Sequence, residues 1–103
     1  MPALAGAQAP VAPVALALGD MPDWAALSVW LSALLFARGD SVVRVKGVVR
    51  TPAGRLLVQT VRQIVQSPEV LPDTPAPTDN TLVLIGRGLT AEAVAASYAR
   101  FAG

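Results

Sequence analysis

Few side chains in this sequence are suited to chemistry, and the clearest group of them is basic. Residues alternate between Ser41 and Arg50, so one face of an extended strand carries Arg44, Lys46 and Arg50 together with Val42 and Val48. The other face carries Val43, Val45, Gly47 and Val49 and would serve the core. Arg62 would join the basic face if a neighbouring strand paired in the right register. Such a face suits a small anion or an acidic partner, and it equally suits a solvated strand surface kept in solution by its charge. No aromatic residue is interleaved with these charges, which argues against single-stranded nucleic-acid binding.

A second feature resembles a phosphate-binding loop without meeting its requirements. Gly86-Arg87-Gly88 comes directly before an expected helix, but the G-x-G-x-x-G spacing and a Walker-type Lys-Ser/Thr pair are both missing. We therefore interpret it as a strand-to-helix turn that needs a permissive glycine φ. Gly47 is interpreted in the same way, as a position of close approach or a bulge rather than a ligand contact.

Catalysis and metal binding lack support in the residues. The chain has no His and no Cys, which removes the commonest general base and the usual zinc ligands. Its seven carboxylates are scattered over turns and loops, and Ser28 and Ser32 have no nearby base that would activate them. We therefore predict no catalytic residue, no cofactor and no metal site.

Length and composition indicate one small domain. The 103 residues carry a net charge of +1, so any electrostatic role must be local. The longest nearly apolar run, Trp24 to Ala37, falls short of the roughly 20 residues that span a bilayer. Residues 1–13 are rich in Ala and Pro and lack the features of a secretory signal, so we predict a linker or tail there and a domain over residues 14–103.

Hydrophobic periodicity and turn residues place the elements that would carry these side chains. We expect strands at Val14–Leu18, Ser41–Arg50, Leu56–Val65 and Thr81–Arg87, with a hairpin turn at Thr51–Gly54 and a proline-rich loop at Ser67–Asn80. One helix is expected from Trp24 to Arg38, ended by Gly39. A last helix is expected after Thr90, its cap, with Val94, Tyr98 and Phe101 on its inner stripe. The predicted fold class is α+β. It is a two-layer sandwich in which a roughly four-stranded, mixed but mostly antiparallel sheet carries two helices on one face, in the order β-α-β-β-β-α. The first helix is long enough to be a crossover that makes the first two strands parallel.

The first helix has more apolar surface than one sheet can cover. One stripe faces the core and consists of Trp24, Leu27, Leu31, Leu34 and Leu35. A second apolar surface is formed by Val29, Trp30, Ala33, Phe36 and Ala37. We expect Trp30 or Phe36 to lie on an apolar patch that the sheet leaves partly uncovered, as interfaces usually do.

Two motifs in this order carry a resemblance to a known family. They are WLSALLFARGDSVVRVKG, from Trp30 to Gly47, and LVLIGRGLT, from Leu82 to Thr90. An apolar helix, a Gly-Asp turn, an RVKG strand, a hairpin and an IGR strand before a last helix are similar to the C-terminal domain of CobW-type (cobalamin synthesis protein) metallochaperone GTPases. The resemblance covers Val14 to Phe101, and the matching positions are Arg38, Gly39, Arg44, Lys46, Gly47, Gly86 and Arg87.

The resemblance implies a function that the residues alone do not. Members are cytoplasmic P-loop GTPases whose N-terminal domain binds GTP and carries a Cys-x-Cys-Cys metal motif, so the GTPase activity would reside outside this domain. The resemblance implies a non-catalytic accessory domain in metal homeostasis or cobalamin biosynthesis, which recognises the GTPase domain, a client metalloprotein or both. Family members often carry histidine where this chain has Gln63 and Gln66, a departure that speaks against a metal role.

For partner contact we single out five residues: Arg44, Lys46, Arg87, Trp30 and Phe36. A stand-alone structural module that forms a homo-oligomer through its apolar helix is the alternative hypothesis. Neither hypothesis predicts a nucleic-acid or membrane partner.

Overall fold

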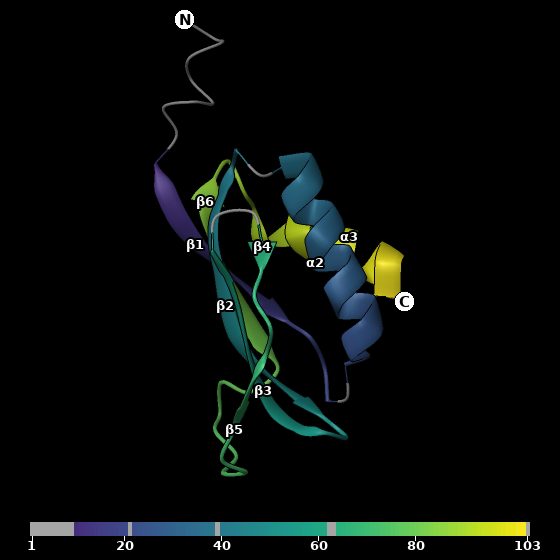
Figure 1. Ribbon diagram of the computed structural model, residues 1–103. Coiled ribbons are helices and arrows are strands. Elements are labelled where there is room, and N and C mark those ends of the chain that lie inside the picture. The colour runs from purple at the N-terminus through teal and green to yellow at the C-terminus, as the bar shows by residue number, and fades with distance from the viewer. Residues whose placement is uncertain (1–9, 21, 39, 62–63, 103) are drawn as a thin grey trace, which may run out of the picture.

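The computed structural model describes residues 10–20, 22–38, 40–61 and 64–102. One layer is a six-stranded sheet and the other consists of two helices that both lie on one face of it (Figure 1). The predicted α+β sandwich is therefore confirmed, with two more strands than the sequence indicated. The elements are β1 (Val11–Ala17), α2 (Trp24–Arg38), β2 (Val42–Thr51), β3 (Gly54–Val61), β4 (Ile64–Val65), β5 (Glu69–Leu71), β6 (Thr81–Arg87) and α3 (Ala91–Ala102).

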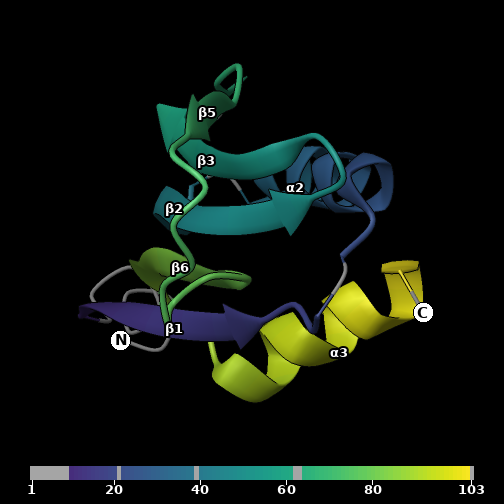
Figure 2. The same cartoon turned by 90° about the horizontal axis from the view of Figure 1, so that it is seen from below.

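The sheet has the order β1-β6-β2-β3-β4, and β5 also pairs with β3. All of its strand pairs are antiparallel. β1 and β2 both run antiparallel to β6 and are therefore parallel to each other, as expected of strands joined by a helical crossover. They are not neighbours, however, because β6 lies between them (Figure 2).

The first strand begins earlier than the sequence analysis expected. β1 starts at Val11, inside the segment that we assigned to the linker, and pairs with β6 from Val11↔Arg87 to Ala17↔Thr81. Pro13 is compatible with this strand because β1 forms the edge of the sheet, where a missing N–H is tolerated.

The predicted alternation of β2 is wrong at its start, because the strand contains a bulge. The register with β6 shifts between Val42 and Arg44, so Val43 is an extra residue. As a result Val42 is buried and Val43 is exposed, the reverse of the expected faces. From Arg44 onward the prediction is confirmed, since Val45 and Val49 are buried in the core.

The third predicted strand does not run through to Val65. β3 ends at Val61, and β4 returns beside it with Thr60 opposite Val65. β5 then continues along the same edge of β3. β5 lies inside the segment Ser67–Asn80, which its prolines led us to predict as a loop. Pro68 and Pro72 lie just outside β5, so the N–H groups of β5 itself are available for pairing.

Both helices begin with the caps that their sequences predict. The Asp23 carboxylate accepts a hydrogen bond from the Ala25 N–H at 2.9 Å, and the Thr90 hydroxyl accepts one from the Ala93 N–H at 3.1 Å. The predicted core stripe of α2 is confirmed, as Leu27, Leu31 and Leu35 are buried, while Trp24 and Leu34 are partly buried and pack against the core. Gly39, the predicted helix stop, lies outside the described residues.

Two glycines allow β6 to lie close to its neighbours. A Cβ built on Gly47 would come 2.4 Å from the carbonyl oxygen of Thr81, and one on Gly86 would come 2.3 Å from that of Ser41. Both obstacles are backbone atoms, so a methyl group would push strands apart. Gly88 is the residue that takes up the positive φ, at 68°, that we expected in this turn.

Gly47→Ala is therefore expected to reduce the free energy of unfolding by about 1–3 kcal/mol, the usual cost of forcing an extra methyl group into a packed site. Urea denaturation followed by circular dichroism would measure this. Lys46→Ala, at the neighbouring exposed position, is the control and is expected to stay within about 0.5 kcal/mol of the parent chain. Equal stability of the two variants would contradict the packing role of Gly47.

Candidate functional site on the open sheet face

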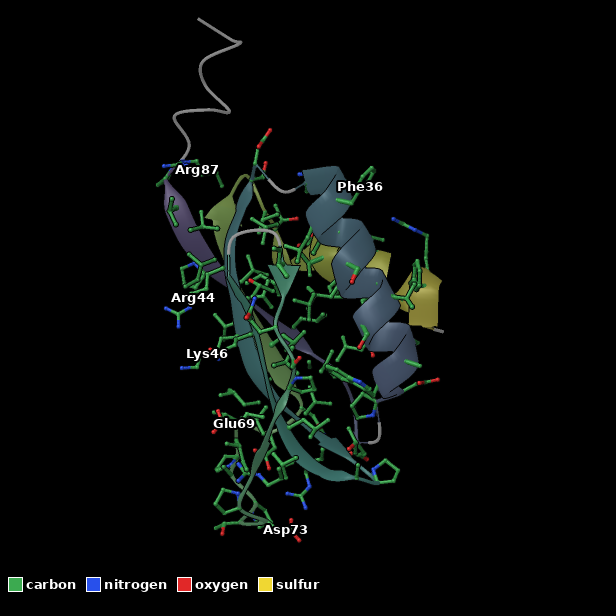
Figure 3. All side chains as sticks on the ribbon, in the orientation of Figure 1. Phe36, Arg44, Lys46, Glu69, Asp73 and Arg87 are labelled. Carbon is green, nitrogen blue, oxygen red and sulfur yellow. The ribbon has the colours of Figure 1, made fainter. Side chains whose placement is uncertain are left out.

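The sheet face opposite the helices is left open, and the predicted basic residues lie on it. Arg44 and Lys46 are exposed and project away from α2 and α3 (Figure 3). The register places Arg44 beside Ile85 and Lys46 beside Val83 on β6. These four side chains line a shallow depression of about 280 Å³. The depression thus has an apolar floor with two cations along one side.

The same face continues across β6 to the edge strand. Arg87 is exposed, lies opposite Val11 of β1, and projects on the same side of the sheet as Arg44 and Lys46 (Figure 3). Val11 and Val83 are 44% and 38% exposed, which is unusual for valines in paired strands. We call the surface formed by Val11, Arg44, Lys46, Val83, Ile85 and Arg87 the open sheet face.

The other two predicted contact residues lie elsewhere. Trp30 is only 2% exposed, because α3 covers it: its indole N–H donates to the Ser97 hydroxyl at 3.0 Å, and its ring meets that of Tyr98 edge to face. Of the two residues expected at an uncovered surface, Trp30 or Phe36, Trp30 is therefore not the one. Phe36 is 94% exposed and projects from α2 on the helix side of the molecule (Figure 3). The five residues thus do not form one site.

Burial also affects the only tyrosine of the chain, which packs against Trp30. Removal from solvent raises the pKa of Tyr98, and the negative charge of Asp23 acts in the same direction. Both effects favour the neutral hydroxyl, so Tyr98 acts here as a packing residue.

The sequence analysis missed a cluster of charges at the end of the sheet where β6 begins. Arg55 forms two hydrogen bonds with the Asp79 carboxylate, from Nε to Oδ2 at 3.0 Å and from Nη2 to Oδ1 at 2.9 Å. Arg50 donates to Asp79 Oδ2 at 3.1 Å and to the exposed Asp73 at 3.2 Å. Arg55 also donates to the Pro72 carbonyl oxygen at 2.7 Å. Arg50, which we had grouped with the free basic residues, is therefore neutralised.

The cluster fixes the charge state of its carboxylate. The two hydrogen bonds from Arg55 hold the pKa of Asp79 far below its usual value, with further help from the Ala76 N–H and from Arg50. Desolvation acts in the opposite direction but is outweighed. The same bonds raise the pKa of Arg55. The side chains of this cluster bond to one another and to the Pro72 carbonyl oxygen, so the cluster stabilises the fold and does not form a reactive site.

One signal in the sequence pointed to this cluster. Once the hairpin turn is placed at Thr51–Gly54, Arg50 falls directly opposite Arg55, as the structure confirms. Like charges directly across an antiparallel pair are unfavourable unless a counter-charge lies between them. That pairing therefore called for a nearby carboxylate, which the proline-rich loop supplies.

Within the described part of the chain we find no group of three or more residues that could hold a metal ion. No described helix is long and apolar enough to cross a membrane. Arg62, which we considered as a further basic residue, lies outside the described residues.

Comparison with known proteins agrees with this architecture. The family model for the cobalamin synthesis protein CobW C-terminal domain matches residues 12–102. This chain belongs to that family. No curated protein matches it.

Two solved structures share the fold. Zn(II)-bound YjiA GTPase from E. coli is 23% identical, with a TM-score of 0.70, over 88% of this chain and 29% of that one. A Zn(II)-bound triple mutant of YjiA GTPase is also 23% identical, with a TM-score of 0.71, over 90% of this chain and 30% of that one. This CobW C-terminal domain thus spans less than a third of the length of those proteins.

The acid sensitivity of the domain follows from the Asp79 cluster. Because the pKa of Asp79 is lower in the folded than in the unfolded state, its contribution to stability is present above about pH 4–5 and is lost as the pH falls below that range. Asp79→Asn is expected to lower the melting temperature at pH 7 and to flatten its decline between pH 5 and pH 3. Asp73→Asn, at an 81% exposed side chain, serves as the control and should change little. A parental pH profile in the Asp79 variant would contradict this assignment.

Proposed function

We propose that this domain is the non-catalytic accessory module of a CobW-type, GTP-dependent metallochaperone, and that it recognises a protein partner through the open sheet face. The partner we propose is the GTPase domain, a client metalloprotein or both. The family match supports the association with a GTPase. A cytoplasmic location and a role in metal homeostasis or cobalamin biosynthesis belong to the same proposal.

The observation that carries this proposal is the composition of the open sheet face. A solvated sheet face is normally polar, whereas this one combines exposed Val11 and Val83 with the cations Arg44, Lys46 and Arg87. Apolar area supplies binding energy and the three cations supply selection. Glu69 of β5, opposite Leu57 on β3, lies farther along the same side of the sheet (Figure 3). The complementary surface would be apolar at its centre with carboxylates around it.

The length relationship supports a partner in the same assembly. This chain corresponds to 29–30% of YjiA GTPase, so the larger part of that protein lies outside the shared domain. A domain that carries an uncovered apolar sheet face is suited to pack against such a part. By this proposal GTP hydrolysis belongs to the partner, and this domain contributes recognition.

A second candidate function rests on α2. Phe36 and Val29 are 94% and 56% exposed on the outer side of this helix, and the only charged residue of α2 is Arg38 at its end. An uncharged helix face of this kind supports the alternative, a module that forms a homo-oligomer through α2.

The open sheet face is tested by charge reversal. The double variant Arg44→Glu, Lys46→Glu is expected to weaken binding to a purified CobW-type GTPase domain at least tenfold in calorimetric titrations, since both cations would become repulsive. Its free energy of unfolding should change by less than about 0.5 kcal/mol, because both side chains are solvated. The control variant Ala53→Glu, Thr74→Glu introduces the same two glutamates at exposed positions away from this face and should bind like the parent chain. Unchanged affinity of the double variant would remove this face from the proposal, and unfolding of the variant would show a structural role.

The helix alternative is tested by the mass of the protein in solution. If α2 forms a homo-oligomer, the parent chain should sediment above its monomer mass of 10.6 kDa, and Phe36→Glu should restore the monomer, because a buried unpaired carboxylate is costly. A monomeric parent chain at about 100 μM would rule out this alternative.

A further inference from the structure

A groove between α2 and α3 lies on the side of the molecule away from the open sheet face. Its volume is about 410 Å³, within the roughly 300–1,000 Å³ of typical ligand pockets. Trp30, Leu34 and Val94 supply large apolar side chains to its lining, and alanines such as Ala33 and Ala93 leave the space open.

Contacts within the domain hold the aromatic part of the lining in place. The indole N–H of Trp30 is already bound to the Ser97 hydroxyl at 3.0 Å, and the Tyr98 ring supports the Trp30 ring at a centroid distance of 5.2 Å. Phe101 lines the same groove and is 49% exposed, although we expected it on the inner stripe of α3. An incoming apolar side chain would therefore meet preformed aromatic surface.

The charge on the groove has one sign. Arg38, the last residue of α2, and Arg100, in the last turn of α3, both line it, and none of the acidic residues in the described part of the chain does. The ion pairs among the described residues all involve Arg50 or Arg55. Arg38 and Arg100 are thus exposed cations beside an apolar lining, an arrangement that repels a basic ligand and attracts an acidic one.

We infer that the α2–α3 groove binds an acidic amphipathic segment of a partner protein, with apolar side chains against Trp30 and Phe101 and carboxylates paired with Arg38 and Arg100. An amphipathic helix that lays its apolar face into a groove is a common mode of peptide recognition. The inference is independent of the proposed function, because the groove and the open sheet face lie on opposite sides of the sheet and share no residue.

The test uses two synthetic 14-residue peptides with Leu and Phe at helical spacing. In one peptide Glu occupies all the remaining positions, and in the other Lys occupies them. Fluorescence anisotropy of the labelled peptides with the whole 103-residue chain is expected to show at least tenfold tighter binding of the Glu peptide. The double variant Arg38→Glu, Arg100→Glu is expected to lose at least tenfold in affinity. The control variant Ala53→Glu, Thr74→Glu introduces two glutamates at exposed positions outside both surfaces, and it should remain within twofold of the parent chain.

A steric variant tests whether binding needs the space of the groove as well as its two arginines. Ala33→Trp fills the groove, keeps both arginines and is expected to abolish binding, while its circular dichroism spectrum shows whether it is folded. Equal affinity for the two peptides, no binding of the Glu peptide at 1 mM, or unchanged affinity in the charge-reversed groove variant would each overturn the inference. Binding to phosphatidylglycerol vesicles without binding to the Glu peptide would also overturn it, since it would assign the groove to a membrane surface.

Discussion

The carboxylate of Asp79 ties β2 and β3 to the loop that leads into the interior strand β6. β6 is the last strand in the sequence, yet it lies between β1 and β2, so the proline-rich loop must cross β2 and β3 before the chain can enter that gap. The bonds from Arg50 and Arg55 to Asp79 fix the loop as it crosses. The next residue completes the connection. Asn80 adopts a positive φ of 61°, donates its N–H to the Val48 carbonyl oxygen at 2.7 Å, and accepts the N–H of Leu18 on its own carbonyl oxygen at 2.8 Å. Asn80 thus links the residue that follows β1 to β2, and β6 begins at the next residue in register with both strands.

This placement of β6 determines what the two faces of the sheet can do. With Leu82 and Leu84 fully buried against the helices, the alternate residues Val83 and Ile85 must point to the other face, where no helix covers them. The position of β6 also requires Gly47 and Gly86, because neighbouring backbone atoms lie too close to these two residues to leave room for a side chain. The glycines of the RVKG and IGR motifs therefore serve the packing of β6, while Arg44, Lys46 and Arg87, from the same two motifs, face solvent.

Much of this could be predicted from the sequence because it depends on local patterns. The bounds of α2, the hairpin turn at Thr51–Gly54, the Thr90 cap and the outward direction of Arg44 and Lys46 all follow from periodicity, turn residues and capping. What could not be predicted depends on contacts between distant segments. The bulge at Val43 follows from pairing with β6, the burial of Trp30 follows from the position of α3, and the return of the chain as β4 and β5 follows from the free edge of β3. The helical pattern showed that α2 has two apolar surfaces but not which one α3 would cover.

The net charge of +1 conceals how the charges are distributed. Arg50 and Arg55 are paired with Asp79 and Asp73, so two of the eight basic residues are neutralised together with two of the seven acidic ones. Among the other described basic residues, Arg44, Lys46 and Arg87 lie on the open sheet face and Arg38 and Arg100 lie at the groove on the opposite side. An almost neutral domain can therefore present two separate cationic surfaces with apolar centres. Because both surfaces carry the same sign of charge and lie back to back, they are suited to hold two different acidic partners at once, or two parts of one partner that wraps around the domain.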